Sequence, residues 1–141
     1  MANEGRSVAQ HEEDMRAIPL HARMGLRLLD HGPHTLMTME LTDDVRGLAP
    51  GSVHGGMLAT FADTASAVAL DGAFVVPTEI PVTTDIHVRF YRQPSSGPLT
   101  AEANLVHRGR RLLSTECSIT DAQRRVLARS TATYMIVPVG G

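Results

Sequence analysis

The sequence predicts an α+β fold in which one curved antiparallel sheet of about six strands wraps around a single long helix. The first observation is a stretch over residues 55–70 that is rich in alanine and leucine, lacks proline and carries one ionisable side chain, Asp63. Because it is apolar nearly all round, we expect a buried helix. The second is an alternation of apolar and polar residues from Ile80 to Tyr91, which is typical of a half-buried strand.

The N-terminal part of the chain differs in character from the rest. Residues 1–23 are polar and mixed in charge, so we expect an extension that contains one short helix ending before Pro19. The remaining residues, 24–141, fit one domain of common size. The sequence therefore predicts a single domain preceded by a short extension.

Short strands joined by tight turns account for the rest of the sheet. Residues 24–30 and 35–41 read as a hairpin, because the Gly32-Pro33 pair between them has turn chemistry. Three further strand-like runs follow the alternating strand, over residues 99–107, 112–121 and 126–137. The connections between these runs are so short that we expect antiparallel neighbours.

The alternating strand also assigns side chains to faces. Its apolar stripe consists of Ile80, Val82, Thr84, Ile86, Val88 and Phe90. Strict alternation therefore places Thr84 on the stripe and Thr83 on the opposite face.

Composition excludes several function classes. A formal net charge of -2 and a pI near 6.4 provide no field that would hold a nucleic acid. One cysteine, Cys117, cannot form an internal disulfide. The first seven residues have no apolar signal core, and no stretch approaches the roughly 20 apolar residues that span a bilayer. We expect a cytoplasmic protein that binds neither nucleic acid nor membrane.

The turn His54-Gly55-Gly56 stands at the expected start of the long helix. Two residues without Cβ allow a ligand to approach the backbone, and the first free N–H groups of a helix can bind developing negative charge. A thioester carbonyl gains such charge as its tetrahedral intermediate forms, so this turn is a candidate oxyanion site. By itself, however, a Gly-Gly pair before a helix is more often only a turn.

Asp63 is a carboxylate inside an otherwise apolar helix. An unpaired buried carboxylate is costly, so such a residue needs a partner or a site that uses its charge. It could activate a water molecule or attack a thioester directly, and the sequence leaves both mechanisms open. A satisfied structural carboxylate is the alternative, and the nearby glycine turn favours the functional interpretation.

Two other polar groups carry weaker signals. His31 and His34 flank a turn without further ligands nearby in the sequence, so we expect no metal site. Arg110 and Arg111 belong to the basic turn 108–111. This turn is either a solvated hairpin or a binding site for the phosphates of coenzyme A, because guanidinium groups suit phosphate oxygens.

The spacing His54-Gly55-Gly56 through Asp63 and Ala65 resembles the central-helix signature of hotdog-fold acyl-CoA thioesterases, in the phenylacetate-degradation (PaaI-like) branch. The strand that follows resembles the same family over Val82-Thr83-Thr84-Asp85-Ile86-His87-Val88, Tyr91-Arg92 and Pro94. The resemblance covers about residues 20–137 and implies the hotdog fold.

The resemblance implies roles for particular residues. Asp63 takes the place of the catalytic carboxylate, Gly55 supplies the N–H that polarises the thioester carbonyl, and His54 orients that loop or the substrate. Thr83 is the best match to a hydroxyl residue that helps to position water or the carboxylate. We expect further substrate contacts from Gly56, Thr84, Arg92, Arg110 and Arg111.

The function implied is hydrolysis of acyl-CoA-type thioesters by water, without a metal or organic cofactor, since coenzyme A is part of the substrate. One residue departs from the pattern: relatives often place an asparagine six residues before the histidine, where this chain has Leu48. The alternative is a non-catalytic hotdog module that binds acyl-CoA or only assembles. The length and kind of the acyl group are not readable from the sequence.

The spacing within the helix bears on assembly. Asp63 lies eight residues beyond Gly55, so their backbones are roughly 12 Å apart along a helix. One carbonyl group cannot easily touch both, but an antiparallel copy of the helix would bring Asp63 of one chain to Gly55 of the other. We therefore expect a two-fold dimer. The family resemblance further implies a tetramer that is a dimer of dimers.

Overall fold

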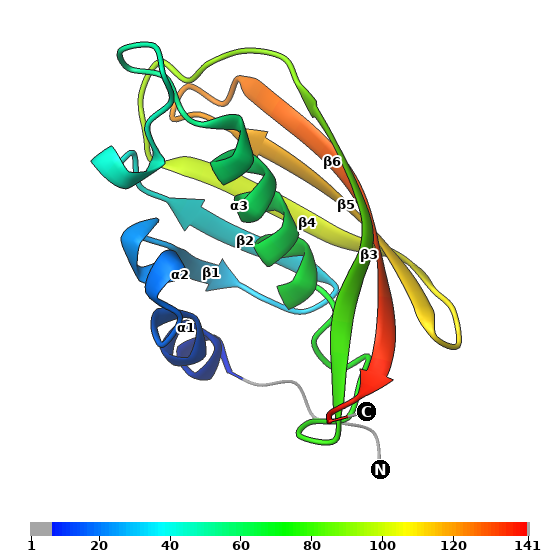
Figure 1. The fold of residues 1–141 in the computed structure, drawn as a ribbon. Coiled ribbons are helices and arrows are strands. Elements are labelled where there is room, and N and C mark those ends of the chain that lie inside the picture. Colours follow the sequence, from blue (N-terminus) through cyan, green and yellow to red (C-terminus); the bar gives the residue numbers. More distant parts are fainter. Residues whose placement is uncertain (1–6, 141) are drawn as a thin grey trace.

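A computed structural model describes residues 7–140 of the chain and shows one antiparallel sheet curled around one helix (Figure 1). The six strands follow the spatial order β1-β2-β4-β5-β6-β3. Their bounds are β1 Arg27–Asp30, β2 His34–Met39, β3 Glu79–Phe90, β4 Leu99–Arg108, β5 Leu112–Thr120 and β6 Val126–Pro138. The predicted fold class is confirmed.

The pairing of the strands follows from their connections. β1 and β2 form the expected hairpin, in which Leu28 lies opposite Met37. β4, β5 and β6 are joined by short turns and pair as antiparallel neighbours. β3 is reached by the long connection after the helix and pairs with β6, so it forms one edge of the sheet.

The central helix, α3 (Gly55–Val68), packs one face on the sheet and leaves the other half-buried. Leu58, Phe61, Ala62 and Ala65 are buried in the main core with strand residues such as Met37. The opposite face is half-buried, and so more open than the sequence predicts for a helix of this composition, because the helices and strands among residues 7–140 cover it only in part. That face consists of Ala59, Thr60, Asp63, Thr64 and Ala67.

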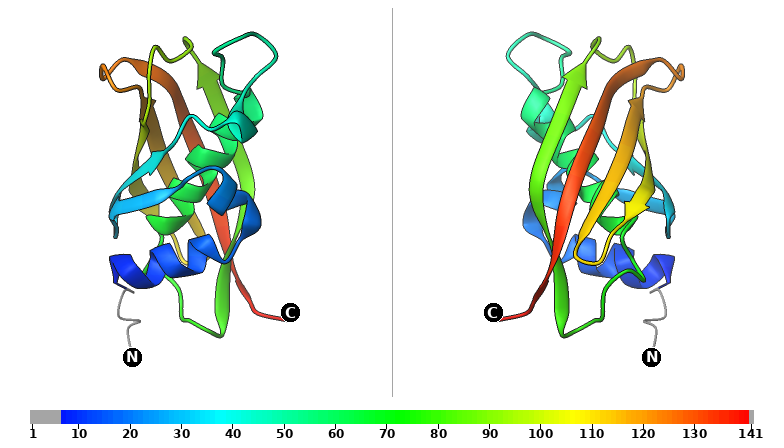
Figure 2. Two further views of the ribbon diagram at one scale, coloured as in Figure 1. Left: turned by 90° about the vertical axis from the view of Figure 1, so that its left-hand side faces the viewer. Right: turned by 90° about the vertical axis from the view of Figure 1, so that its right-hand side faces the viewer.

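Two short helices precede the sheet, where the sequence predicts one. α1 (Val8–Arg16) begins at the N-cap Ser7, and α2 (Pro19–Arg23) begins at Pro19. Proline is tolerated in the first turn of a helix, so Pro19 ends the expected helix and also starts a second one. α1 crosses near the C-terminal end of α3 (Figure 2) and buries Met15 in the main core. A 3-10 turn, η1 (Asp43–Val45), lies in the loop before α3.

A β-bulge in β3 overturns the strict alternation expected for this strand. Thr83 pairs with Tyr134 and Asp85 with Thr133, which leaves Thr84 as the extra residue. A bulge shifts every side chain on one side of it to the other face. Thr83 therefore faces α3 together with Ile86, contrary to the face predicted from the sequence.

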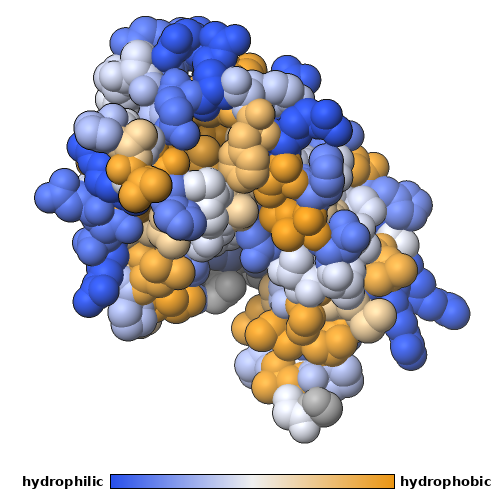
Figure 3. Space-filling view, turned by 45° about the horizontal axis from the view of Figure 1, so that its top comes forward, coloured by the Kyte–Doolittle hydropathy of each residue, from blue (hydrophilic) through white to orange (hydrophobic). Residues whose placement is uncertain are grey.

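The two ends of the sheet differ in surface character. Hydrophobic side chains gather on the projecting end of the molecule, where β3 begins and β6 ends (Figure 3). The exposed apolar residues there are Val75, Val76, Ile80, Val82 and Val139. No helix among residues 7–140 is long and apolar enough to cross a membrane.

Candidate active site

The carboxylate of Asp63 is held by two hydroxyl groups from the sheet. Thr83 donates a hydrogen bond of 2.9 Å to Oδ1, and Tyr134 donates one of 2.8 Å to the same atom. The Tyr134 hydroxyl also lies 3.0 Å from the backbone oxygen of Asp63. Both carboxylate bonds fix Oδ1, so Oδ2 is the oxygen best placed to meet a reactant on the half-buried face of α3.

Tyr134 is a residue of this site that sequence reasoning missed. Its side chain is 1% exposed, and it lies opposite Thr83 in the ladder between β3 and β6. Burial, and then the neighbouring charge and hydrogen bond of Asp63, raise the pKa of Tyr134 well above its usual range. The phenol therefore stays protonated and acts as a donor to the carboxylate.

The start of α3 is shaped by His54 acting as N-cap. The imidazole Nδ1 of His54 accepts a hydrogen bond of 2.9 Å from the backbone N–H of Gly56. The backbone N–H of His54 donates to the backbone oxygen of Val45 at 2.8 Å. A Cβ at Gly56 would lie 3.0 Å from the imidazole ring, so glycine suits this close approach. The cap uses the N–H of Gly56, which leaves the N–H of Gly55 as the free donor of the turn among the described residues.

The loop before α3 is anchored by Gln93, a second residue that the sequence did not single out. Its Oε1 accepts a hydrogen bond of 2.8 Å from Val53 N. This contact joins the loop that precedes the glycine turn to the segment after β3. Leu48, at the position of the family's asparagine, lies in the same loop and is fully exposed.

The chain separates the two halves of the expected site. β3 runs antiparallel to α3, so Thr83 lies beside Asp63. Phe90, near the other end of the strand, lies beside Gly55, where an added Cβ would be 3.7 Å from its ring. Within one chain, Asp63 and Gly55 thus lie apart along α3, and only Asp63 lines the cavity beside the helix.

A cavity of about 540 Å³ opens beside Asp63. Its wall is mostly apolar and draws on the N-terminal helices, the segment after α3 and the start of β3, with Met15, Ile18, Phe74, Ile80 and Pro81 among the lining residues. His21 of α2 also lines it, with Nε2 3.5 Å from the hydroxyl of Thr64. Burial lowers the pKa of His21, which favours a neutral imidazole there.

The remaining expected contacts lie apart from Asp63. Thr84, the bulged residue, donates its hydroxyl to Thr133 O at 3.1 Å. Arg92 is exposed just after β3. Arg110 and Arg111 are exposed on the turn between β4 and β5, where they line a separate shallow hollow with His107, Leu112 and Thr133.

Comparison with known proteins identifies the class to which this fold and site belong. The sequence profile of the Thioesterase superfamily matches residues 50–128, more than half of the chain. The chain belongs to this superfamily.

Particular relatives agree with this assignment. A "Putative esterase" of Halobacterium salinarum is 33% identical over 103 residues, which cover 72% of this chain. The match covers 55% of that protein, so the chain spans about half the length of the curated relative it matches.

Solved structures show the same fold. A thioesterase from Haemophilus influenzae matches with a TM-score of 0.86 at 18% identity and covers 100% of this chain and 98% of its own. The PaaI protein of the E. coli phenylacetic acid degradation operon matches with a TM-score of 0.78 at 22% identity, over 92% of this chain and 93% of its own. At these identities the likeness concerns the fold.

Proposed function

We propose that the protein hydrolyses acyl-CoA-type thioesters to a free acid and coenzyme A. The observation that carries the proposal is the Asp63 carboxylate, which Thr83 and Tyr134 orient and which lines a mostly apolar cavity. An apolar cavity suits an acyl group, and a fixed carboxylate beside it suits attack on the acyl carbonyl. Placement in the PaaI-like branch is part of the proposal and rests on the resemblance of the motif from His54 to Ala65.

The reaction can proceed in two ways from this geometry. In the first, Asp63 takes a proton from water, the water oxygen bonds to the thioester carbon, and the C–S bond breaks as the thiolate leaves and takes up a proton. In the second, a carboxylate oxygen of Asp63 bonds to the thioester carbon and the C–S bond breaks, so that the thiolate leaves and takes up a proton. Water then hydrolyses the resulting mixed anhydride to the free acid and regenerates the carboxylate. In both, the N–H of Gly55 stabilises the oxyanion, and the chemistry uses no metal or organic cofactor.

The complete site requires a second chain in this proposal. β3, with 12 residues, pairs with β6 on one side, and no strand among residues 7–140 pairs with its other side. Ile86 and Phe90 on its inner face are exposed. Such an edge is a template for pairing with another strand. Antiparallel pairing of β3 with its copy, about a two-fold axis at His87, sets Thr83 of one chain opposite Phe90 of the other, because Thr84 is the extra residue of the bulge. This register brings Asp63 toward Gly55 of the partner subunit.

The proposal extends to the assembly, the nucleotide end and the compartment. Two such dimers would form the tetramer that the family resemblance implies.

Arg110 and Arg111, and Arg92 beyond β3, are candidates for contacts with the phosphates of coenzyme A. The proposed compartment is the cytosol, where thiols stay reduced, and Cys117 is a buried free cysteine.

The experiment that tests this function is a panel of acyl-CoA substrates assayed by thiol release, with Asp63→Asn as the matched control. The amide keeps the shape of the side chain but cannot act as base or nucleophile, so we expect it to lose most activity while keeping its fold and assembly. Comparable turnover by this variant would contradict the assignment of Asp63. If no thioester is turned over while acyl-CoA still binds, the protein is a non-catalytic binding module.

A further inference from the structure

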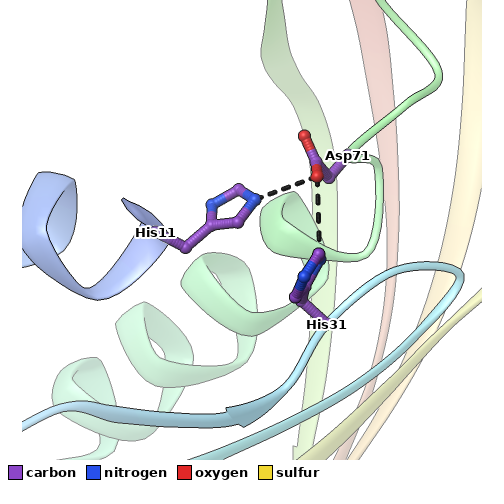
Figure 4. Close-up of side chains that lie close together, drawn as sticks. All are labelled: His11, His31 and Asp71. Atoms are coloured by element: carbon purple, nitrogen blue, oxygen red, sulfur yellow. Dashed lines mark ion pairs between the residues drawn. The ribbon is translucent and has the colours of Figure 1, made fainter. Parts of the chain in front are cut away.

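A second polar cluster lies near the C-terminal end of α3, away from the glycine turn at its start. His11 is on α1, His31 is in the turn between β1 and β2, and Asp71 is in the turn that follows α3. Segments far apart in the sequence therefore bring two imidazole rings to one carboxylate (Figure 4). His34, which the sequence groups with His31, points elsewhere and contacts Asn104 at 2.6 Å.

The spacing of the three groups fits a small cation. His11 Nε2 lies 3.0 Å and His31 Nδ1 lies 3.7 Å from Asp71 Oδ2. One ligand atom from each residue can be chosen so that all three lie within 4.8 Å of one another. Bonds of about 2.0–2.1 Å to a tetrahedral zinc ion place neighbouring ligand atoms about 3.3 Å apart. Small side-chain rotations would bring the cluster to that geometry.

The three side chains of the cluster are largely shielded from solvent. The side chains of His11 and Asp71 are 6% and 2% exposed, and that of His31 is 20% exposed. His11 Nε2 and His31 Nδ1 are buried and form no hydrogen bond with any residue between 7 and 140. The distance of 3.0 Å between His11 Nε2 and Asp71 Oδ2 would allow a hydrogen bond, but the angles at these atoms do not fit one. A cation between the groups would coordinate both nitrogen atoms.

The donor set selects the kind of ion. Two imidazole nitrogens and one carboxylate oxygen suit Zn²⁺ and similar divalent transition metals, whereas Mg²⁺ and Ca²⁺ prefer oxygen ligands. His11 and Asp71 also line the cavity beside Asp63, so an ion and a water molecule as fourth ligand have a path to the cluster.

We propose that His11, His31 and Asp71 bind one divalent transition-metal ion, with Zn²⁺ as the best fit. The ion would fasten α1 to the turn after α3 and thereby fix the wall of the cavity that α1 provides. Asp71 lies three residues beyond the end of α3 at Val68, whereas Asp63 lies within the helix. The site is therefore structural and independent of the proposed hydrolysis.

Metal titration of the purified, chelator-treated protein tests the site. We expect calorimetry with Zn²⁺ to show one ion bound per chain, and Co²⁺ to give visible absorption bands of an ion with nitrogen ligands. Zn²⁺ should also raise the melting temperature, because an ion bound only by the folded chain stabilises it. His11→Gln and His31→Gln should each weaken binding at least about tenfold.

His34→Gln is the matched control, since it removes an exposed histidine three residues from His31 and should leave binding unchanged. If one-to-one binding is absent, or if all three variants bind as the unchanged protein does, the cluster is only an ion pair of histidine and aspartate. Should His11→Gln fail to fold, the Co²⁺ spectrum of His31→Gln decides, because that side chain is less buried and its loss removes one nitrogen ligand.

Discussion

At the scale of single residues, the site depends on how the sheet holds one oxygen of Asp63. Thr83 and Tyr134 are direct neighbours across two strands, and both donate to Oδ1. Two donors at one atom fix the orientation of the carboxylate more strictly than one donor could. Because both donors bind Oδ1, Oδ2 is the oxygen left for a water molecule or the thioester in the proposed reaction.

Removing one of these donors should slow the reaction without unfolding the protein. Tyr134→Phe keeps the buried ring but removes a hydrogen bond to a charged group, which is worth about 1.5–3 kcal/mol. If that bond holds the carboxylate in its reactive position, kcat should fall by about 10–100-fold. Steady-state thiol-release kinetics measure this effect. Tyr91→Phe is the control, because Tyr91 is the other tyrosine and is exposed; equal kcat in both variants would exclude the role of Tyr134.

At the scale of elements, Asp121 joins the turn between β5 and β6 to the segment before β4. Oδ1 accepts from the N–H groups of Gln123 and Arg125 at 3.0 Å each. Oδ2 accepts from Arg125 Nε at 3.0 Å and from Ser95 N at 3.3 Å. Burial raises the pKa of Asp121, but the hydrogen bonds from Arg125 and Ser95 together outweigh burial and lower the pKa from 3.8 to about 2.

This carboxylate should make stability depend on pH in the acid range. A pKa that is lower in the folded chain means that the unfolded chain binds the proton more readily. The contribution is therefore fully present above the unfolded value of 3.8 and is lost as the pH falls toward about 2. Melting temperatures measured across this window should fall less steeply for Asp121→Asn, which should also be less stable at neutral pH. Asp44→Asn, at an exposed position, should keep the original profile.

The turn between β4 and β5 permits a test of the nucleotide contact. If Arg110 and Arg111 bind the phosphates of coenzyme A, replacing both with Ala should raise KM for acyl-CoA much more than for an acyl-pantetheine thioester that lacks the nucleotide. Both side chains are exposed, so the fold should not change. Equal effects on the two substrates would identify the turn as a solvated hairpin.

The sequence predicts the elements well because each has a local signal. The glycine turn and the proline-free stretch predict α3 from Gly55, and the alternation predicts β3 within one residue at each end. What it misses depends on contacts between distant segments. The bulge at Thr84 and the approach of Tyr134 to Asp63 arise from the register of β3 against β6, which no local pattern encodes. The meeting of His11 with Asp71 likewise follows from the path of α1 over the fold.

At the scale of the whole molecule, the half-buried face of α3 and the free edge of β3 both adjoin the candidate active site. The half-buried face of α3 contains Asp63, and the inner face of β3 exposes Ile86 and Phe90. A second copy paired along β3 would cover both surfaces and bring the N–H of Gly55 to the carboxylate. The expected consequence is that neither chain of a dimer has a complete site by itself.

Complementation between two inactive variants tests this shared site. Asp63→Ala lacks the carboxylate. Gly55→Pro lacks the N–H but should still begin α3, because proline is tolerated at the first helical position. His54 already has an extended backbone, with ψ of 128°, as a residue before proline requires. An added Cβ at Gly55 would meet only the Phe90 ring at ordinary contact distance, 3.7 Å. Each variant alone should be nearly inactive.

Mixing the two variants should restore activity if the site crosses the interface. A dimer of one Asp63→Ala chain and one Gly55→Pro chain has one site with both lesions and one site with none. Random pairing of equal amounts makes about half of the dimers mixed, so co-refolding should recover about a quarter of the unaltered activity. Activity should appear only after subunits exchange, which mass spectrometry of differently labelled chains can follow. Mixed dimers that form but remain inactive would show that Asp63 and Gly55 do not meet across the interface.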